Sequence, residues 1–309
     1  MRRALLSTLF VYSFASGANG WRLDFEPLPG QIVVRLDGKP LTTLHYDPKW
    51  DKPFLYPIRT VSGLTISRGW PVEPRPGEQE DHPWHRGIWW GHGDINGEDF
   101  WREKPDLSTS RLVADGKPKT ADESIDIKLA MITSRGKRIG SVSHRYTFRR
   151  DRRNLVIDVT ITVSADRGEA LRFGDTEDGG FAFRLADGFR QDRGARMINS
   201  EGQLGTEQMW GRPARWTDYS ASINGRLAGV AILDHSENIR HPTRWHARGY
   251  SLNSANPFAL GDFTGDKTND GSYMLPAGRQ LHLRYRIVVH EGVQSSDDLE
   301  RYFKSFSSK

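Results

Sequence analysis

The stretch LVIDVTITV at residues 155–163 has apolar side chains at alternating positions. Successive side chains of a strand point to opposite faces, so this period predicts a strand with one buried face. The same alternation recurs at residues 125–131 and 281–289, and turn signals such as Asn224-Gly225 separate the runs. We therefore predict an all-β chain that folds as a large antiparallel β-sandwich.

One helix pattern stands out, and it lies near the end of the chain. Ser295 or Ser296 can cap a first turn that contains Asp297 and Asp298, and apolar residues follow at helical spacing. We expect a short C-terminal helix attached to a single β-sandwich domain that spans residues 21–309.

The first 20 residues have the order of a secretory signal peptide. Arg2 and Arg3 precede an apolar run that ends at Ala15, and small residues follow. The run is shorter than the roughly 20 residues that span a bilayer. We therefore expect cleavage of the leader and export to the periplasm or the medium, with a retained membrane anchor as the alternative. Cysteine is absent, which excludes disulfides and thiolate metal sites.

The distribution of charge argues against a nucleic-acid partner. The chain of 309 residues carries a formal net charge of +5. Its densest basic segment, residues 149–153, is interrupted by Asp151 and flanks a predicted turn. After cleavage of the leader, no apolar segment is left that would hold the chain in a membrane.

Histidine and tryptophan are concentrated in residues 81–101, which read DHPWHRGIWWGHGDINGEDFW and hold three of the ten histidines and four of the ten tryptophans. If residues 88–94 are extended, Trp90, His92 and Asp94 share one face. An indole can stack on the apolar face of a pyranose while imidazole and carboxylate bind its hydroxyls. The pattern therefore indicates a sugar site. The alternative is that the tryptophans are core residues and the histidines are structural.

A second dense segment, residues 234–250, reads DHSENIRHPTRWHARGY. Alternation after Pro242 would set Arg244, His246, Arg248 and Tyr250 on one face, which could bind an acidic or hydroxylated ligand. The alternative is a solvated strand face whose charges pair with neighbouring carboxylates.

A third segment, FGDTEDGGFAFRL at residues 173–185, carries carboxylates just before two glycines. Acid–base work at a sugar requires a positioned carboxyl group of tuned pKa, and Glu177 and Asp178 are the candidates. Surface turns are also rich in acidic residues and glycine, so a structural role is the alternative.

Other chemistries have weaker support in the sequence. Histidine pairs such as His82 and His85 could serve a divalent metal, but their spacing matches no established ligand motif. Signatures of serine hydrolases, P-loop proteins and dinucleotide-binding proteins are missing. No cofactor can therefore be assigned, and a divalent metal stays open as an alternative.

Several segments resemble the DUF6807 family, whose members are often labelled methane oxygenase PmoA. The resemblance rests on HPWHRGIWWGHGDINGEDFW at 82–101, DTEDGG at 175–180, INSEG at 198–202, WGRPARWTDYS at 210–220 and DHSENIRHPTRWHARGYSLNSANPF at 234–258. It implies an exported bacterial protein associated with carbohydrate breakdown. It does not imply methane oxidation, because a membrane monooxygenase would need several apolar spans.

The closing strand with its preceding turn at residues 275–289 and the histidine-rich early strand also look like the galactose-mutarotase type of large β-sandwich, which is an analogy of fold alone. We expect an exported carbohydrate-active protein, most simply an enzyme that acts on a glycosidic bond or a sugar carbon by acid–base catalysis. Glycoside hydrolase, lyase and sugar epimerase are the reaction classes considered. A non-catalytic carbohydrate-binding module is the alternative.

The expected site draws on all three segments. The expected catalytic residues are His92, Asp94, Glu177, Asp178 and His246. The expected substrate-binding residues are His82, His85, Trp90, Trp101, His241, Trp245 and Arg248. Strands that are distant in sequence become neighbours in a sandwich, so residues 82–101 and 234–250 should meet around one cleft near Glu177.

Overall fold

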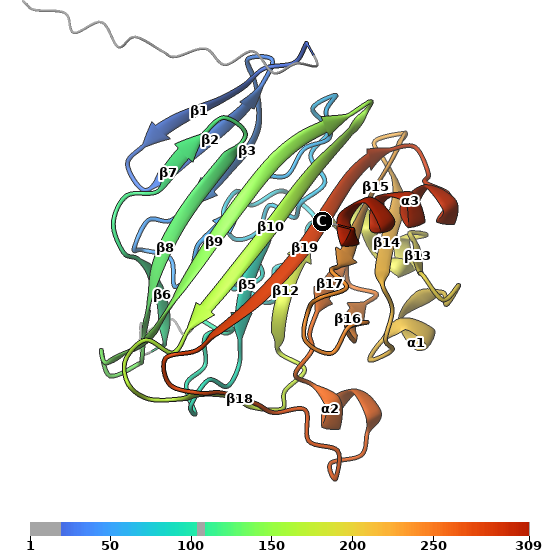
Figure 1. Ribbon diagram of the computed structural model, residues 1–309. Coiled ribbons are helices and arrows are strands. Elements are labelled where there is room, and N and C mark those ends of the chain that lie inside the picture. The colour runs from blue at the N-terminus through green and yellow to red at the C-terminus, as the bar shows by residue number, and fades with distance from the viewer. Residues whose placement is uncertain (1–19, 104–108, 309) are drawn as a thin grey trace, which may run out of the picture.

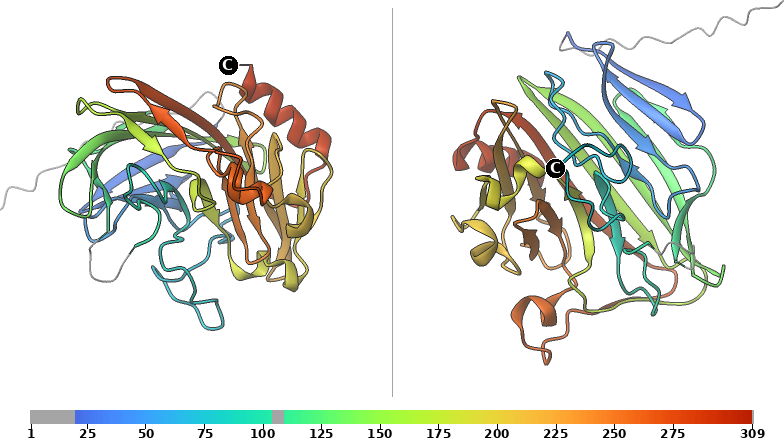
Figure 2. Two further views of the ribbon diagram at one scale, coloured as in Figure 1. Left: turned by 90° about the horizontal axis from the view of Figure 1, so that it is seen from below. Right: turned by 180° about the vertical axis from the view of Figure 1, so that it is seen from behind.

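The computed structural model describes residues 20–103 and 109–308, so the expected signal peptide, apart from Gly20, lies outside the described residues. Two large antiparallel sheets lie face to face and form a β-sandwich (Figures 1 and 2). A short helix follows the last strand. The predicted fold class is thus confirmed. No helix within the described ranges is long and apolar enough to cross a membrane.

The first sheet has eight strands, five from the N-terminal part of the chain and three from later in the sequence. Its order is β1 (Leu23–Leu28), β2 (Gln31–Leu36), β3 (Lys39–His45), β4 (Phe54–Leu55), β5 (Ile88–His92), β12 (Gly179–Arg184), β17 (Leu252–Ala255) and β16 (Trp245–Arg248). Strands from two of the histidine-rich segments, β5 and β16, therefore lie in one sheet.

The second sheet has nine strands and includes the longest ones. Its order is β13 (Arg196–Asn199), β14 (Trp216–Ile223), β15 (Arg226–Asp234), β19 (Gln280–Glu291), β10 (Asn154–Ser164), β9 (Arg138–Asp151), β8 (Ser124–Ile132) and β6 (Arg111–Ala114), with β7 (Lys119–Ala121) paired to β8. The three predicted alternating runs lie in β8, β10 and β19.

Short elements complete the chain. The pair β11 (Leu171–Phe173) and β18 (Tyr273–Leu275) forms a small third sheet. The remaining helical turns are η1 (Asp187–Phe189), η2 (Gln191–Arg193), α1 (Gly205–Met209) and α2 (Leu260–Thr264), and the C-terminal helix is α3 (Ser296–Ser307).

The main core lies between the two sheets. Every second residue of β10 from Leu155 to Val163 is buried there, at 0–1% exposure. Phe181 of β12 stacks on Tyr285 of β19 with ring centroids 4.7 Å apart, which joins the two sheets directly. Alternation produced this core because one face of each long strand meets the opposite sheet and the other face meets solvent.

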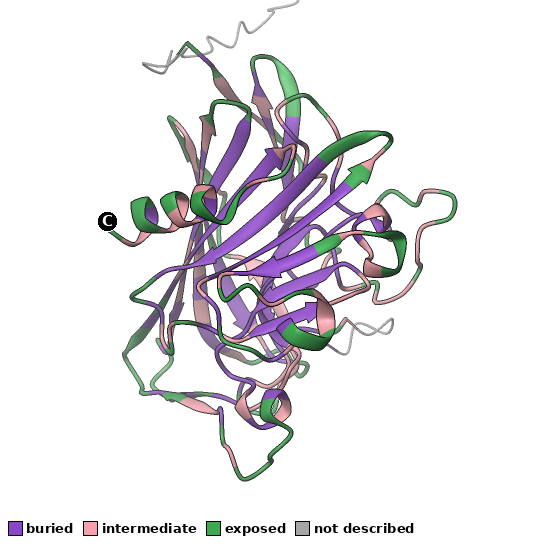
Figure 3. Cartoon of the chain, turned by 90° about the vertical axis from the view of Figure 1, so that its right-hand side faces the viewer, coloured by how far each residue is buried: buried purple, intermediate pink, exposed green. Residues whose placement is uncertain are grey.

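Helix α3 covers part of the outer face of the nine-stranded sheet (Figures 1 and 3). Ser295 caps it, because its side chain accepts from the backbone N–H of Asp298 while the Asp298 carboxylate accepts from Ser295. Leu299 and Phe306 pack on Leu233 and other apolar residues of the sheet. The buried apolar face of this amphipathic helix thus holds α3 against the nine-stranded sheet.

The outer face of the eight-stranded sheet is covered as well, by loops instead of a helix. Phe54, Trp89 and Leu252 on this face form an apolar cluster with Trp101. Trp50 and Trp84 from the connecting segments pack against it. The view from behind shows these loops crossing in front of the sheet (Figure 2, right). Strand β5 is therefore buried on both faces, and the chemistry-bearing side chains gather on its outer face.

Candidate functional site

Four aromatic rings form a stack that leads from the outer face of the eight-stranded sheet toward solvent. Trp89 of β5 lies at its base, with its ring centroid 5.1 Å from that of His85. His85 stacks on His82 at 4.7 Å, and His82 stacks on Tyr250 at 5.4 Å. Trp101 packs beside the base, 5.2 Å from Trp89. Residues from the first and second histidine-rich segments thus meet here, as predicted.

His82 is held in an unusual backbone conformation. Its φ is 41°, in the left-handed region that residues other than glycine rarely adopt. Its Nδ1 lies 2.9 Å from Oδ2 of Asp81, and its side chain is 38% exposed. No residue in the described ranges makes a hydrogen bond with its Nε2. The imidazole therefore pairs with a carboxylate through one nitrogen and offers the other to a ligand.

Two buried arginines hold Asp81 in place. Nη2 of Arg184 donates to Oδ1 of Asp81 at 2.8 Å, and Nη1 of Arg68 donates to the same oxygen. Burial by itself would raise the pKa of Asp81, but His82, Arg184 and Arg68 together hold it well below its ordinary value. Asp81 is consequently ionised and lies within ion-pair distance of Nδ1 of His82.

His85 contributes differently because it is enclosed. Burial keeps the pKa of its imidazole well below the ordinary value, and Arg184 adds to the effect. Its Nδ1 lies 3.4 Å from Nη1 of Arg184, and its Nε2 has no partner in the described part of the chain. His85 is thus a neutral ring that stacks between Trp89 and His82.

Two carboxyl groups lie beside the stack, in the turn that leads into β12. The side chains of Glu177 and Asp178 are 32% and 20% exposed. Burial raises the pKa of Glu177 while Arg248 opposes the rise. Burial likewise raises the pKa of Asp178 against the effect of Arg102. His82 also acts electrostatically on Asp178, so carboxyl groups with raised pKa values and a free imidazole nitrogen share one site.

Arg248 and His246 come from β16 and approach the same carboxyl groups. Nη2 of Arg248 donates to Oε2 of Glu177 at 3.1 Å. His246 donates from Nδ1 to the carbonyl oxygen of Glu177 at 2.9 Å and accepts at Nε2 from Arg248 at 2.8 Å. Burial, assisted by Arg248, lowers the pKa of His246 to about 3. Both nitrogens of His246 are therefore occupied, which makes it a positioning residue for Glu177 and Arg248.

Glycines allow β12 to pass close to its neighbours at this point. A Cβ on Gly179 would lie 2.2 Å from Nδ1 of His92, and one on Gly180, whose φ is 94°, would lie 2.0 Å from the carbonyl oxygen of Ala255. No larger residue fits at either position. The paired glycines thus let the turn that carries Glu177 and Asp178 lie directly against β5 and β17.

A surface hollow of about 530 Å³ adjoins the open end of the stack. Arg248 and Tyr250 form one wall, and residues of η2 and α1 form the other. Arg184 lies over the ring of Tyr250 at 4.7 Å, so this ring is fixed by a cation–π contact. The hollow is thus a place where a polar ligand could extend from the stack.

Trp90, His92 and Trp245 lie on the inner side of their strands and not at the ring stack, contrary to the prediction that they line the ligand site. Trp90 and Trp245 are buried in the main core at 1% and 0% exposure. His92 donates from Nε2 to the carbonyl oxygen of Gly174 at 2.8 Å, and burial lowers its pKa to about 4. The face was assigned wrongly because β5 is buried on both sides, and alternation does not distinguish two buried faces.

Asp94 and His241 also lie away from the stack. Asp94 accepts from the backbone N–H of Gly97 at 2.8 Å within a turn, and its other charged contact is Arg172 at 3.8 Å. His241 pairs with Asp234 at 2.7 Å and stacks on Phe303 of α3. These contacts are those of structural residues, as the alternative interpretation held.

Sequence reasoning missed Arg68, Asp81, Arg102 and Arg184 as members of the site. A charged residue in the otherwise apolar run FAFRL is the signal that identifies Arg184. Arg68 comes from a loop without any recognisable pattern. As to metals, the described residues contain no group of three or more histidine, cysteine, aspartate or glutamate side chains that could hold an ion.

A family model described as "Family of unknown function (DUF6807)" matches residues 31–304. No curated protein has a similar sequence. Neither comparison attaches the methane oxygenase label to the chain.

Several solved structures have a similar course of the chain. A putative aldose 1-epimerase from Escherichia coli K12 is 14% identical, with 88% of this chain and 100% of that chain covered and a TM-score of 0.40. A galactose mutarotase-like protein from Lactobacillus casei ATCC 334 is 8% identical, with 87% and 100% covered and a TM-score of 0.41. A polysaccharide lyase is 12% identical, with 92% and 34% covered and a TM-score of 0.35. These likenesses are too low to carry an argument about activity.

Proposed function

Because the chain belongs to the DUF6807 family, whose function is unknown, we propose a function from the site itself: an exported enzyme that acts on a carbohydrate by acid–base catalysis. The observation that carries the proposal is that His82, which stacks on Tyr250, lies near enough to act electrostatically on Asp178. Glu177 directly precedes Asp178 in the same turn. The imidazole has a free nitrogen, and both carboxyl groups have raised pKa values. Proton transfer near neutral pH needs such a combination.

Substrate binding would use the open end of the ring stack. The rings of Trp84 and Tyr250 are only partly buried, and aromatic faces of this kind pack on the C–H face of a pyranose. Arg248 donates in a planar fork that suits hydroxyl and carboxylate oxygens. The adjoining hollow of about 530 Å³ has room for further sugar units beside Arg248.

In the proposed chemistry His82 is the base. Its Nε2 takes a proton from a sugar hydroxyl or from an attacking water, while Asp81 stabilises the imidazolium that forms. One of the two carboxyl groups, whose pKa burial raises, acts as the acid and gives a proton to the ring oxygen or to the departing glycosidic oxygen. With water as the nucleophile, these steps cleave a glycosidic bond. With the anomeric hydroxyl as the proton donor, they break the bond between the anomeric carbon and the ring oxygen to give the open-chain aldehyde, and reclosure on the other face by the reverse proton transfers inverts the anomeric carbon.

Product analysis tests this proposal. The mature chain, residues 21–309, is incubated with a panel of free sugars and oligosaccharides, and products are followed by mass spectrometry and NMR. We expect His82→Ala to abolish turnover, and Glu177→Gln or Asp178→Asn to lower it by about 100-fold or more. Glu169→Gln is the matched control, because Glu169 is 57% exposed and pairs only with Lys137.

A non-catalytic carbohydrate-binding module is the second candidate, and the exposed rings are the observation that favours it. In that case ligands bind across a broad panel without any product, and Glu177→Gln leaves affinity nearly unchanged while Tyr250→Ala reduces it. If His82→Ala keeps the turnover that the wild type shows, the role proposed for His82 is contradicted.

Export is proposed from the leader. N-terminal sequencing of protein recovered from the producing cell should begin between Asn19 and Arg22, as expected for cleavage after small residues. Recovery of protein with Met1 intact inside the cell would contradict it.

A further inference from the structure

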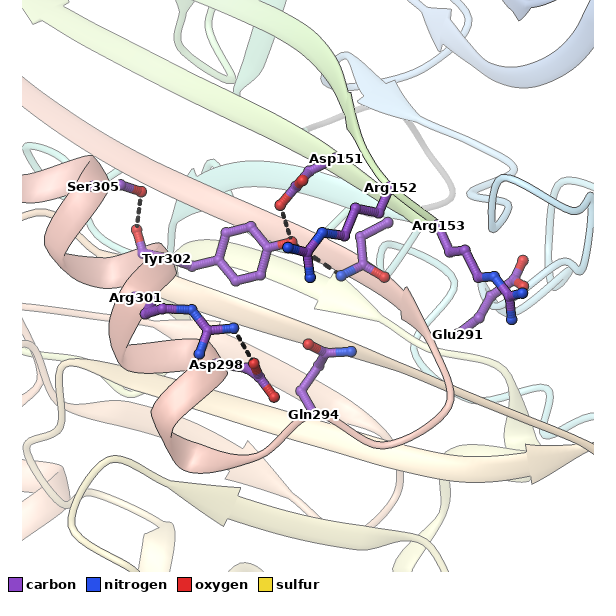
Figure 4. Close-up of a pocket in the computed structure, with 10 residues that line it drawn as sticks. Asp151, Arg152, Arg153, Glu291, Gln294, Asp298, Arg301, Tyr302 and Ser305 are labelled. Atoms are coloured by element: carbon purple, nitrogen blue, oxygen red, sulfur yellow. Dashed lines mark hydrogen bonds and ion pairs between the residues drawn. The ribbon is translucent and has the colours of Figure 1, made fainter.

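A second polar hollow, of about 570 Å³, lies on the opposite side of the sandwich from the candidate site. The turn between β9 and β10 and the first turns of α3 enclose it (Figure 4). Its residues include Arg152 and Arg153 from the basic segment 149–153 that the proposed function leaves unexplained. Gln294 and Arg301 line it from the side of α3.

The carboxylates around this hollow already have partners within the protein. Asp151 accepts from the hydroxyl of Tyr302 at 2.5 Å. Asp298 accepts from the hydroxyl of Ser295 at 2.6 Å and from Arg301. Glu291 accepts from the backbone N–H of Ser62 at 3.0 Å. Each of these carboxylates thus has at least one donor partner within the protein.

Three hydrogen-bond donor groups of the lining, by contrast, have no hydrogen-bond partner among the described residues. The guanidinium groups of Arg152 and Arg153 and the amide of Gln294 make no hydrogen bond or ion pair with any residue that the structure describes. In Figure 4 the Arg152 guanidinium lies beside the hydroxyl of Tyr302, with Gln294 and Arg301 on the helix side, while Arg153 lies toward the other end. The guanidinium groups of Arg152 and Arg153 and the amide of Gln294 are therefore available to a ligand, whereas each carboxylate of the lining has a donor partner.

Arg152 also occupies a position that the backbone does not favour for it. It is the first central residue of the two-residue turn between β9 and β10, and its φ is 56°. Glycine or asparagine is the usual residue at such a position. An arginine is less stable than glycine in this backbone conformation. Its side chain makes no compensating hydrogen bond or ion pair with the described residues. A ligand would supply that contact.

A neighbouring hollow extends the basic surface. About 300 Å³ in volume, it shares Asp151, Tyr302 and Ser305 with the first and is lined by Arg149 and Arg150. Arg149 and Arg150 lie in β9, are half-buried and pair with Asp158 and Asp37, so the free guanidinium groups of this surface are those of Arg152 and Arg153 in the turn. Arginine forks bind carboxylate and sulfate oxygens in pairs, and the amide of Gln294 suits a neighbouring sugar hydroxyl.

From these observations we propose that the hollow between the β9–β10 turn and α3 binds an anionic saccharide, through Arg152 and Arg153 to its carboxylate or sulfate group. The site is separate from the ring stack, so it holds whether or not His82 is catalytic. It would bring an acidic polysaccharide to the protein on the face opposite the candidate active site.

Calorimetric titration of the mature chain tests this proposal. The probes are a galacturonic acid oligosaccharide, a sulfated oligosaccharide of similar length and a neutral galactose oligosaccharide. We expect saturable binding of at least one anionic probe, at least tenfold tighter than the neutral one and weakened by added NaCl. The two anionic probes distinguish a carboxylate ligand from a sulfate ligand.

The variants place the binding at the hollow. The double variant Arg152→Asn with Arg153→Gln should lose tenfold or more in affinity for the anionic probe. Its thermal midpoint should be unchanged or higher, since asparagine tolerates the positive φ. Arg135→Gln, in the exposed turn between β8 and β9, is the matched control and should bind as the wild type does. Equal binding of neutral and anionic probes, no binding of either anion, or full affinity in the double variant would each overturn the proposal.

Discussion

Replacing Asp81 with asparagine should destabilise the fold far more than the loss of an ordinary surface carboxylate. The side chains of Arg68 and Arg184 are 0% exposed, and both donate to Oδ1 of Asp81. Burial and nearby Arg68 together lower the pKa of Arg184 to about 10, although Asp81 opposes the shift. Asparagine removes the negative charge that compensates two buried cations.

The expected magnitude follows from this geometry. Breaking a buried ion pair costs about 3–5 kcal/mol, whereas an exposed pair contributes at most about 1 kcal/mol. Asp81 is 31% exposed, so water screens part of the loss, and asparagine retains one oxygen as an acceptor. We therefore expect the free energy of unfolding to fall by roughly 2–3 kcal/mol and the thermal midpoint by roughly 3–5 °C.

The pH dependence gives a second signature. The pKa of Asp81 is lower in the folded chain than its ordinary value. Its stabilising contribution is therefore present above about pH 4, the value for the unfolded chain, and is lost as the pH falls through the folded pKa. The difference in stability between the wild type and Asp81→Asn should shrink accordingly in acid.

Urea denaturation at several pH values measures both effects. Asp192→Asn is the matched control, because Asp192 pairs with Arg190 and is 62% exposed. A double-mutant cycle with Arg184→Met should return a coupling energy of at least 1 kcal/mol, as expected for groups in direct contact. If Asp81→Asn costs no more than Asp192→Asn, the reasoning that the buried guanidinium groups depend on Asp81 is refuted.

Three further predictions concern other parts of the fold. Burial lowers the pKa of His92 to about 4, so unfolding takes up a proton below about pH 6.5 and stability should fall between about pH 6.5 and pH 4. In His92→Gln the fall should be less steep. Equal pH slopes of the two proteins in denaturation experiments would contradict this. Trp90→Ala should lower stability by about 3–5 kcal/mol, and lost ligand affinity in a fully folded variant would argue against a pure core role. Ser295→Ala should lower stability by about 1 kcal/mol in the same assay, while no change would mean that the cap of α3 contributes nothing.

The candidate site was predictable only in part. Glu177, Asp178 and Arg248 could be recognised because carboxylates before paired glycines and a basic strand near aromatic residues are local patterns. His82 and His85 were recognised by the crowding of histidines around them. Their stacking order could not be foreseen, since it depends on how the loop that carries them folds over β5.

The choice between Trp89 and Trp90 illustrates the limit. Both indoles are about 1% exposed, but Trp90 lies in the main core and Trp89 at the base of the ring stack. Their sequence neighbours do not distinguish them. The difference arises because residues 56–87 fold back over the outer face of the sheet, which makes that face apolar as well.

Sequence alone determined the all-β architecture and the capped C-terminal helix, because strand alternation and helix capping are local and each acts over a few residues. Tertiary structure decided which of two buried faces carries the candidate site. It also brought Arg68 and Arg184, which are far apart in the chain, onto the single carboxylate of Asp81. Contacts of this kind depend on the pairing of distant strands, and no local pattern encodes which loops will cover them.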